Sequence, residues 1–249
     1  MKGLRLFLAI FAVAAVGIVV GGAAGGAPKP QVCGGNQTLN PGMYGNLQIN
    51  GMCRLPPAGT VFASRILIMP GGMLDATRGA DLGVLYGITI QSTGSLSIGC
   101  EFDPSCGVAT IIGGINADRP TDVIIHNSFI QGNVAINGGG GGTAGSCSRS
   151  DPLAGVPYSD IEDSTIQGNV TVTGYQACWF GMFRNVIPGI VILRDNTLED
   201  PDAMEIADNQ IATLLCQRNT PAPQFGDSGG GLNLVGFAGG QCRAVSAPP

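Results

Sequence analysis

Two segments of this chain, Ile125-His-Asn-Ser-Phe-Ile-Gln-Gly-Asn-Val-Ala-Ile136 and Ile161-Glu-Asp-Ser-Thr-Ile-Gln-Gly-Asn-Val-Thr-Val172, are copies of one twelve-residue pattern. Seven of the twelve positions are identical. Both copies end in alternating apolar residues, which is typical of a short strand with one buried face. The sequence therefore indicates an internal repeat built on short β-strands.

The same alternation recurs along the rest of the chain. It is clear at 47–49, 66–68, 88–90, 134–136, 170–172 and 190–192, and weaker at 110–112 and 213–215. The last apolar residues of successive strands lie 19 to 24 residues apart, with one exception. A period in the twenties predicts a solenoid, and short strands with glycine-rich turns favour a parallel β-helix over a leucine-rich repeat.

Asparagine and aspartate recur at one point of the pattern. Two looser copies, Phe183-Arg-Asn185 and Ile206-Ala-Asp208, follow the two strong ones. Stacked coils would place Asn127, Asp163, Asn185 and Asp208 above one another, where their side chains could bond the backbone of each turn. We predict a turn ladder here; the alternative is that these residue types are merely common in turns.

The exception to the period is the interval from Ile136 to Val172, which is 36 residues long. Residues 138–142 are all glycine, and the segment that follows contains Cys147. The sequence predicts a loop inserted into one coil at about 138–160. Long loops in compact folds are often functional, so we expect this loop to be the recognition element.

The composition excludes several classes of protein. Of 249 residues, 41 are glycine, 44% are hydrophobic and only 12% are charged. Disordered chains have the opposite balance, collagen needs glycine at every third position, and helical bundles need many alanines, leucines and charges. The net charge of −5, with no basic patch, also argues against nucleic acid as a partner.

The first residues predict export. A short basic start with Lys2 and Arg5 precedes an apolar run at 6–20 and small residues at 21–27. This is the layout of a secretory signal peptide over 1–27, which leaves a single β-helix domain over 28–249. The alternative is an uncleaved anchor, which would be the one point of contact with a membrane.

The cysteines also indicate an exported protein. All eight follow the signal segment: Cys33, Cys53, Cys100, Cys106, Cys147, Cys178, Cys216 and Cys242. An even number in an exported chain predicts disulfides, although eight cysteines allow 105 connectivities. The simplest prediction pairs neighbours along the chain, 33–53, 100–106, 147–178 and 216–242. Spacings typical of zinc sites are missing from the sequence.

The Gly-Asn-Val-x-Ile/Val segments and the tail Leu215-Cys-Gln-Arg-Asn-Thr-Pro-Ala-Pro223, leading to Gly240-Gln-Cys242, carry a resemblance. Over residues 33–242 the chain resembles right-handed parallel β-helix proteins, and more narrowly small exported β-helix proteins of actinobacteria. The resemblance implies an all-β, right-handed parallel β-helix, and it implies no activity because that narrower group has no established function. The repeat period predicts about eight coils.

One motif resembles the nucleophile segment of chymotrypsin-like serine proteases. It is Gly226-Asp-Ser-Gly-Gly230, which would make Ser228 the nucleophile. The base would be His126, the one histidine of the chain. The residues around His126 differ from those around the histidine of the protease family. His126 also lies between two inward positions of the repeat, which points its side chain outward. Gly231 stands where the protease family has proline. A serine hydrolase is therefore only an alternative function.

Carbohydrate chemistry is the second alternative, since β-helices often host pectin-active enzymes. The Asn-Thr-Asp, Asp-Asp and His-Gly segments of polygalacturonase-like families are missing from this sequence, and Asp118-Arg119-Pro120 is only a weak match to a lyase base. The acidic run 199–205 offers Asp200, Asp202 and Glu205 as possible calcium ligands. A solvated turn is the commoner reading, and we expect no metal or other cofactor.

The sequence therefore favours a secreted or cell-surface scaffold that binds a polysaccharide or another cell-wall polymer without catalysis. Aromatic side chains stack on sugar rings over a large contact area. The candidate ligand-binding residues are Trp179, Phe180, Tyr158 and Arg149. The alternative, which such aromatic runs more often follow, is that Trp179 and Phe180 fill space beneath the inserted loop. The lyase or hydrolase and the serine hydrolase remain as alternatives.

Overall fold

A computed structural model describes residues 31–100, 106–226 and 231–246 of the chain. The predicted signal peptide at 1–27 and the predicted nucleophile Ser228 lie outside the described residues. In the part of the chain that the structure covers, no helix has the length and apolarity needed to cross a membrane.

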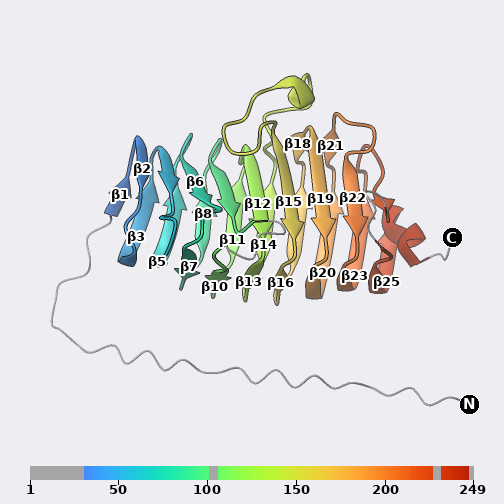
Figure 1. Cartoon of the computed structure of the whole chain (residues 1–249). Coiled ribbons are helices and arrows are strands. Elements are labelled where there is room, and N and C mark those ends of the chain that lie inside the picture. The colour runs from blue at the N-terminus through green and yellow to red at the C-terminus, as the bar shows by residue number, and fades with distance from the viewer. Residues whose placement is uncertain (1–30, 101–105, 227–230, 247–249) are drawn as a thin grey trace, which may run out of the picture.

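The described chain forms a parallel β-solenoid of about nine turns. Its coils stack side by side along one axis, as Figure 1 shows. The repeat period predicted about eight coils, one fewer than the structure has. The first strand of the nine-stranded sheet is β2 (Asn36–Thr38), which is exposed at every position. The all-β parallel solenoid predicted from the period is confirmed.

One face of the solenoid is a nine-stranded parallel sheet to which each turn contributes one strand. In spatial order the strands are β2, β4 (Met52–Arg54), β6 (Met73–Ala76), β9 (Ser95–Ile98), β12 (Asp122–His126), β15 (Tyr158–Glu162), β19 (Trp179–Phe183), β22 (Met204–Ala207) and β24 (Gln224–Phe225).

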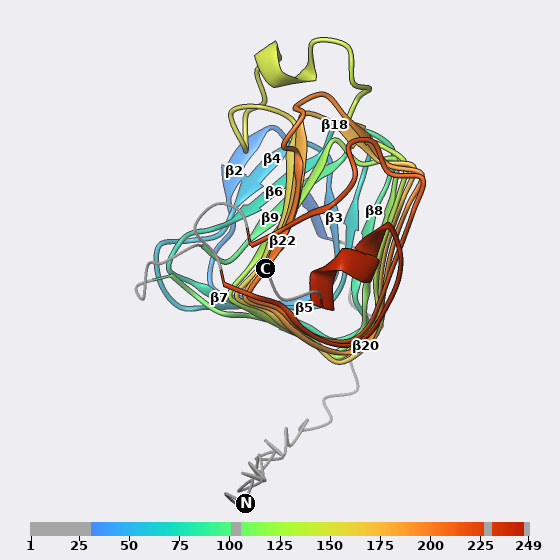
Figure 2. The same ribbon diagram turned by 90° about the vertical axis from the view of Figure 1, so that its right-hand side faces the viewer.

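A 14-stranded sheet covers the two remaining faces, because long strands such as β5 pair with different neighbours at their two ends. The view along the axis in Figure 2 shows the coils superposed around a common core. The strands are β1 (Gln31–Cys33), β3 (Gly42–Ile49), β5 (Thr60–Ile68), β7 (Asp81–Val84), β8 (Ile88–Ile90), β10 (Ala109–Ile111), β11 (Ile115–Asp118), β13 (Ser128–Ile130), β14 (Val134–Asn137), β16 (Thr165–Ile166), β17 (Val170–Thr173), β20 (Val186–Arg194), β23 (Gln210–Gln217) and β25 (Leu234–Gly240).

The remaining elements lie at corners and at the C-terminal end. Strands β18 (Gln176–Ala177) and β21 (Thr197–Leu198) form a small parallel pair. Two short 3₁₀ segments, η1 (Ser146–Ser148) and η2 (Gln241–Ser246), are the helical elements of the described residues.

The core consists of columns of aliphatic side chains, one from each coil. Parallel pairing in register places equivalent residues directly above one another. One column contains Ile68, Ile90, Ala117, Ile136 and Val172, all fully buried. Burying such a side chain stabilises the fold by roughly 1.5–3 kcal/mol.

Three of the predicted strand markers are wrong. Ala117, not Ile112, stacks between Ile90 and Ile136, because 109–111 forms β10 on a neighbouring face. Leu193, not Ile192, stacks on Val172, because residues 190–193 are all apolar and the pairing with β17 turns Val191 and Leu193 inward. Cys216, not Leu214, stacks on Leu193 in the next coil.

The predicted turn ladder is also displaced by one residue. The register stacks Asn127, Asp163, Arg184 and Asp208 at the turn, and all four have positive φ angles between 43° and 58°. Asn185 lies one position further along, in the column of Ser128, Ser164, Asn209 and Asn233. The copy that begins at Phe183 should have been aligned from Met182, which pairs with Ile161.

That neighbouring column is a buried hydrogen-bonded ladder. The side-chain oxygen of Asn185 accepts a hydrogen bond from the backbone N–H of Ser164 at 3.1 Å, and Asn209 accepts one from Asn185 at 3.0 Å. Asn233 continues the series by accepting from Asn209 at 3.0 Å. A second ladder joins Tyr175, Asn196, Asn219 and Gln241 in the same way. These side chains satisfy backbone groups at the corners, where strand pairing is interrupted.

The four predicted disulfides are confirmed: Cys33–Cys53, Cys100–Cys106, Cys147–Cys178 and Cys216–Cys242. The first and last join elements at the two ends of the solenoid, which are the coils with a neighbour on one side only. Four disulfides indicate an oxidising environment of the kind found outside the cell.

The inward positions of β20 can be tested with two of its aliphatic residues. Leu193 is fully buried, whereas Ile190 is 42% exposed. We expect Leu193→Ala to lower the free energy of unfolding by about 2–5 kcal/mol because it leaves a cavity in the core. Ile190→Ala should cost clearly less in the same urea titration. A larger loss from Ile190→Ala would contradict the register.

Candidate functional site

The outer face of the nine-stranded sheet carries aromatic and charged side chains. Side chains alternate between the two faces of a strand, so Ile125 and Ile161 fill the core while His126 and Glu162 point outward. The register aligns the outward residues in columns: Tyr158 with Trp179, Asp160 with Gly181 and Glu205, and His126 with Glu162 and Phe183. Four strands, β12, β15, β19 and β22, thus bring together residues that are up to 79 positions apart in the chain.

Trp179 is the centre of an aromatic cluster on this face. Its ring stacks on Phe183 with centroids 5.8 Å apart and planes within 6°, and Tyr158 meets it edge-on at 5.9 Å. The two stacked rings lie over Gly181, where a Cβ atom would collide with both of them. The indole Nε1 donates a hydrogen bond to Glu205 at 3.3 Å, so the orientation of the ring is fixed.

An open pocket of about 410 Å³ lies beside this cluster. It is lined by Val156, Tyr158, Asp160, Cys178, Trp179 and Asp200. Aromatic faces and carboxylates therefore share one concave surface, next to the loop that connects β14 to β15.

That loop, 138–157, projects from the solenoid at the top of Figure 1. The Cys147–Cys178 disulfide joins it to the residue before β19. The Glu199 carboxylate accepts hydrogen bonds from the N–H of Cys147 at 2.7 Å, the Ser146 hydroxyl at 2.8 Å and the N–H of Gly145 at 3.0 Å. These bonds, led by the one from Cys147, lower the pKa of Glu199. The loop wall beside the pocket is therefore held in place.

A charged cluster lies next to the aromatic one. The Nε2 atom of His126 is 3.0 Å from Oδ2 of Asp160. Arg184 donates to Glu162 at 2.7 Å and to both carboxylate oxygens of Asp163 at 2.7 and 2.9 Å. These hydrogen bonds, with the two carboxylates nearby, raise the pKa of Arg184, which therefore stays charged.

Among the predicted ligand-binding residues, Tyr158 and Trp179 line the pocket. Phe180 does not, because it points into the core and is fully buried. Arg149 stays within the loop, where it donates to the carbonyls of Gly141 and Ala144. His126 points outward as expected, yet it is only 8% exposed because its neighbours cover it.

The predicted calcium ligands do not converge. The Asp200 side chain accepts a hydrogen bond from the N–H of Asp202, and Asp202 accepts one from Gln224. Glu205 instead accepts from Trp179. Within the described residues, the set whose ligand atoms do converge is His126, Asp160 and Glu162. The period-two pattern could have revealed that Asp160 and Glu162 share a face, but not that His126 joins them.

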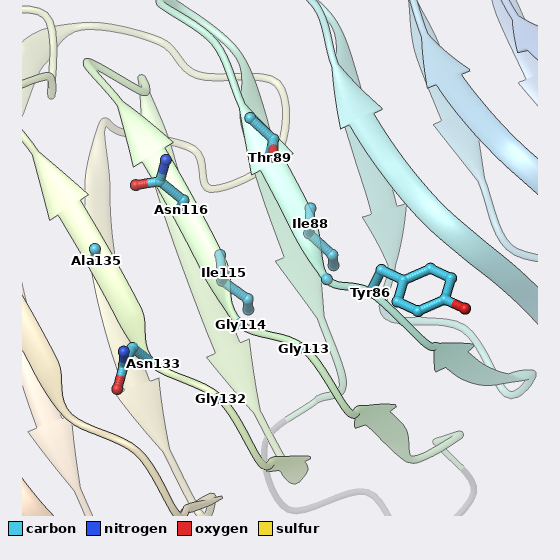
Figure 3. A pocket seen from close by; sticks show the side chains of 11 residues that line it. Tyr86, Ile88, Thr89, Gly113, Gly114, Ile115, Asn116, Gly132, Asn133 and Ala135 are labelled. Atoms are coloured by element: carbon cyan, nitrogen blue, oxygen red, sulfur yellow. The ribbon is translucent and has the colours of Figure 1, made fainter.

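A second pocket lies on another face and is shown in Figure 3. Gly114 and Gly132 line this pocket, and glycine is required at both because a Cβ atom would collide with the backbone of a neighbouring coil. Tyr86 at its edge is 64% exposed. Since no charged side chain lines this groove, it offers fewer means of recognition than the pocket at Trp179.

The fold and this outer-face site define the chain as a parallel β-solenoid with a polar and aromatic surface pocket. No family model matches the chain, and no curated protein or solved structure matches it significantly.

A buried carboxyl near the inserted loop has an unusual titration. Asp122 is fully buried on β12, and burial raises the pKa of its carboxyl to about 8. Ser95 acts in the opposite direction by hydrogen bonding, and the charge of Asp151 in the loop raises the pKa further. Asp122 therefore carries its proton at neutral pH in the folded protein.

This titration predicts a pH dependence of stability. The folded protein keeps the Asp122 proton up to about pH 8, whereas the unfolded chain releases it near its ordinary pKa of 3.8. The folded state thus binds more protons between these values, and the free energy of unfolding falls as the pH rises from 3.8 to about 8. Asp122→Asn should reduce this fall and should be more stable than the wild type at pH 8. Urea titrations of both proteins between pH 3.8 and 8 measure the free energy of unfolding and its dependence on pH.

The matched control is Asp118→Asn, because the Asp118 side chain is 63% exposed. This variant should keep the wild-type dependence of stability on pH. If Asp122→Asn also kept the wild-type dependence of stability on pH, the buried Asp122 carboxyl would not be the source of that dependence.

Proposed function

We propose that this chain is an exported scaffold that binds a polysaccharide in the pocket beside Trp179. The observation that carries the proposal is the pair of aromatic side chains, Tyr158 and Trp179, which line an open pocket together with carboxylates. Sugar rings present apolar faces that stack on aromatic rings, and their hydroxyl groups donate hydrogen bonds to carboxylates. Because Trp179 is fixed by Phe183 and Glu205, little side-chain entropy is lost on binding.

The charges of the site favour a neutral or amino sugar over a uronic acid. Asp160 and Asp200 line the pocket, and the chain as a whole has a net charge of −5. An anionic polymer would be repelled by these carboxylates. The predicted ligand is therefore an uncharged or cationic polysaccharide such as a glucan or chitosan.

The place of action in this proposal is the cell surface or the extracellular medium. Four disulfides support it, since such bonds persist in oxidising compartments. The predicted signal peptide at 1–27 is a separate argument from the sequence alone.

A second candidate is hydrolysis of the bound polymer. Asp160 and Glu162 each place a carboxylate oxygen within 4.8 Å of the other, close to the roughly 5–5.5 Å between the two carboxyl groups of retaining glycosidases. Release of reducing ends that is lost in Asp160→Asn would establish hydrolysis. The serine hydrolase also stays a prediction, because Ser228 lies outside the described residues and His126 contacts Asp160.

The binding proposal predicts that the Trp179→Ala variant loses affinity for polysaccharide. We expect this variant to bind soluble polysaccharide about two- to tenfold more weakly, since loss of an aromatic contact costs roughly 0.5–1.5 kcal/mol. Affinity electrophoresis through gels containing neutral, cationic and anionic polysaccharides would measure the retardation. Wild-type protein should be retarded by a neutral or cationic polymer and not by an anionic one.

The matched control is Tyr86→Ala, which removes an exposed aromatic residue from the groove on the other face. It should bind like the wild type. Loss of binding in Tyr86→Ala but not in Trp179→Ala would move the site to that groove. No retardation of the wild type by any polymer would overturn the proposal.

A further inference from the structure

His126, Asp160 and Glu162 meet on the outer face as a direct result of strand register. Asp160 and Glu162 are two residues apart on β15, so they project from the same side of that strand. His126 on β12 pairs with Glu162, and its imidazole reaches toward Asp160. One potential ligand atom from each of the three side chains lies within 4.8 Å of the others.

The separation of these atoms fits ligands of one metal ion. Zinc lies about 2.0–2.2 Å from imidazole nitrogen and carboxylate oxygen, which places adjacent ligand atoms about 3–3.5 Å apart. The Nε2 atom of His126 and the Oδ2 atom of Asp160 are 3.0 Å apart. A small inward movement of Glu162 would complete a three-ligand set with positions left open for water.

The balance of charge at the cluster also favours a cation. His126, Asp160 and Glu162 are 8%, 3% and 6% exposed, so their charges are weakly screened by solvent. Arg184 supplies one positive charge, which it shares between Glu162 and Asp163. A metal ion binds the neutral form of the His126 imidazole, which adds none. The group therefore has a surplus of negative charge that a bound divalent ion would offset.

We propose that His126, Asp160 and Glu162 bind one divalent transition-metal ion of the zinc or manganese class. One imidazole nitrogen with two carboxylate oxygens suits these ions, whereas calcium and magnesium take oxygen ligands almost exclusively. All eight cysteines are in disulfides, so thiolates do not compete for the ion. The site does not rest on the polysaccharide proposal, although Asp160 also lines that pocket.

Calorimetric titration of the tag-free, disulfide-bonded chain with zinc and with manganese chloride tests the stoichiometry. We expect one ion per chain, and calcium chloride at the same concentrations should give no comparable heat. His126→Gln and Glu162→Gln should each weaken zinc binding by at least about tenfold. Asp202→Asn, which removes an exposed carboxylate outside the cluster, should leave it unchanged.

The single histidine gives a readout that does not depend on a variant folding correctly. Because the chain has one histidine, its imidazole signals in the proton NMR spectrum belong to His126. Substoichiometric manganese should broaden these signals selectively in the wild type. The proposal is overturned if millimolar zinc and manganese do not bind, if the imidazole signals stay sharp, or if folded His126→Gln binds zinc as tightly as the wild type.

Discussion

In-register parallel pairing between successive coils is the constraint on which the rest of this structure depends. Each strand satisfies its backbone groups by pairing with the strands above and below it, so equivalent residues must superpose from coil to coil. An aliphatic residue at one inward position therefore requires an aliphatic residue at the next, as in the column through Ile90, Ala117 and Ile136. The low charge of the chain follows from the number of such inward columns on three faces.

Strand pairing stops at the corners of the coils, and side-chain hydrogen bonds to the backbone join successive coils there. Asn185, Asn209 and Asn233 each accept a hydrogen bond from the backbone of the preceding coil, and the series through Asn196 and Asn219 does the same at another corner. An amide side chain can both donate and accept, so it satisfies two coils at once. Positive φ angles next to the first ladder let the chain turn sharply between faces.

The same stacking explains how charged groups come to be buried outside the core. Outward positions on the nine-stranded sheet also form columns, so His126, Asp160 and Glu162 cover one another, and Trp179 and Phe183 lie across Gly181. The inserted loop, held by the Cys147–Cys178 disulfide and by Glu199, adds a wall on one side. The candidate site therefore lies beside the coil that carries the inserted loop, where the structure departs from the repeat.

The sequence by itself determined the parallel solenoid and its approximate period, because alternation and spacing are local properties of the chain. It left 105 disulfide connectivities open, and the simplest of them, which pairs neighbours along the chain, is the one in the structure. Two of the four residues it proposed for ligand binding, Tyr158 and Trp179, line the pocket on the outer face. It misplaced Ile112 and Ile192, because neighbouring residues are also apolar and the pattern alone does not say which of them faces the core. It misplaced Asn185 because its repeat copy begins one residue earlier, and Phe180 because alternation beside Trp179 turns it into the core. Only the tertiary structure brought His126 to Asp160 and Glu162, because contacts between coils depend on the register of strands separated by the inserted loop.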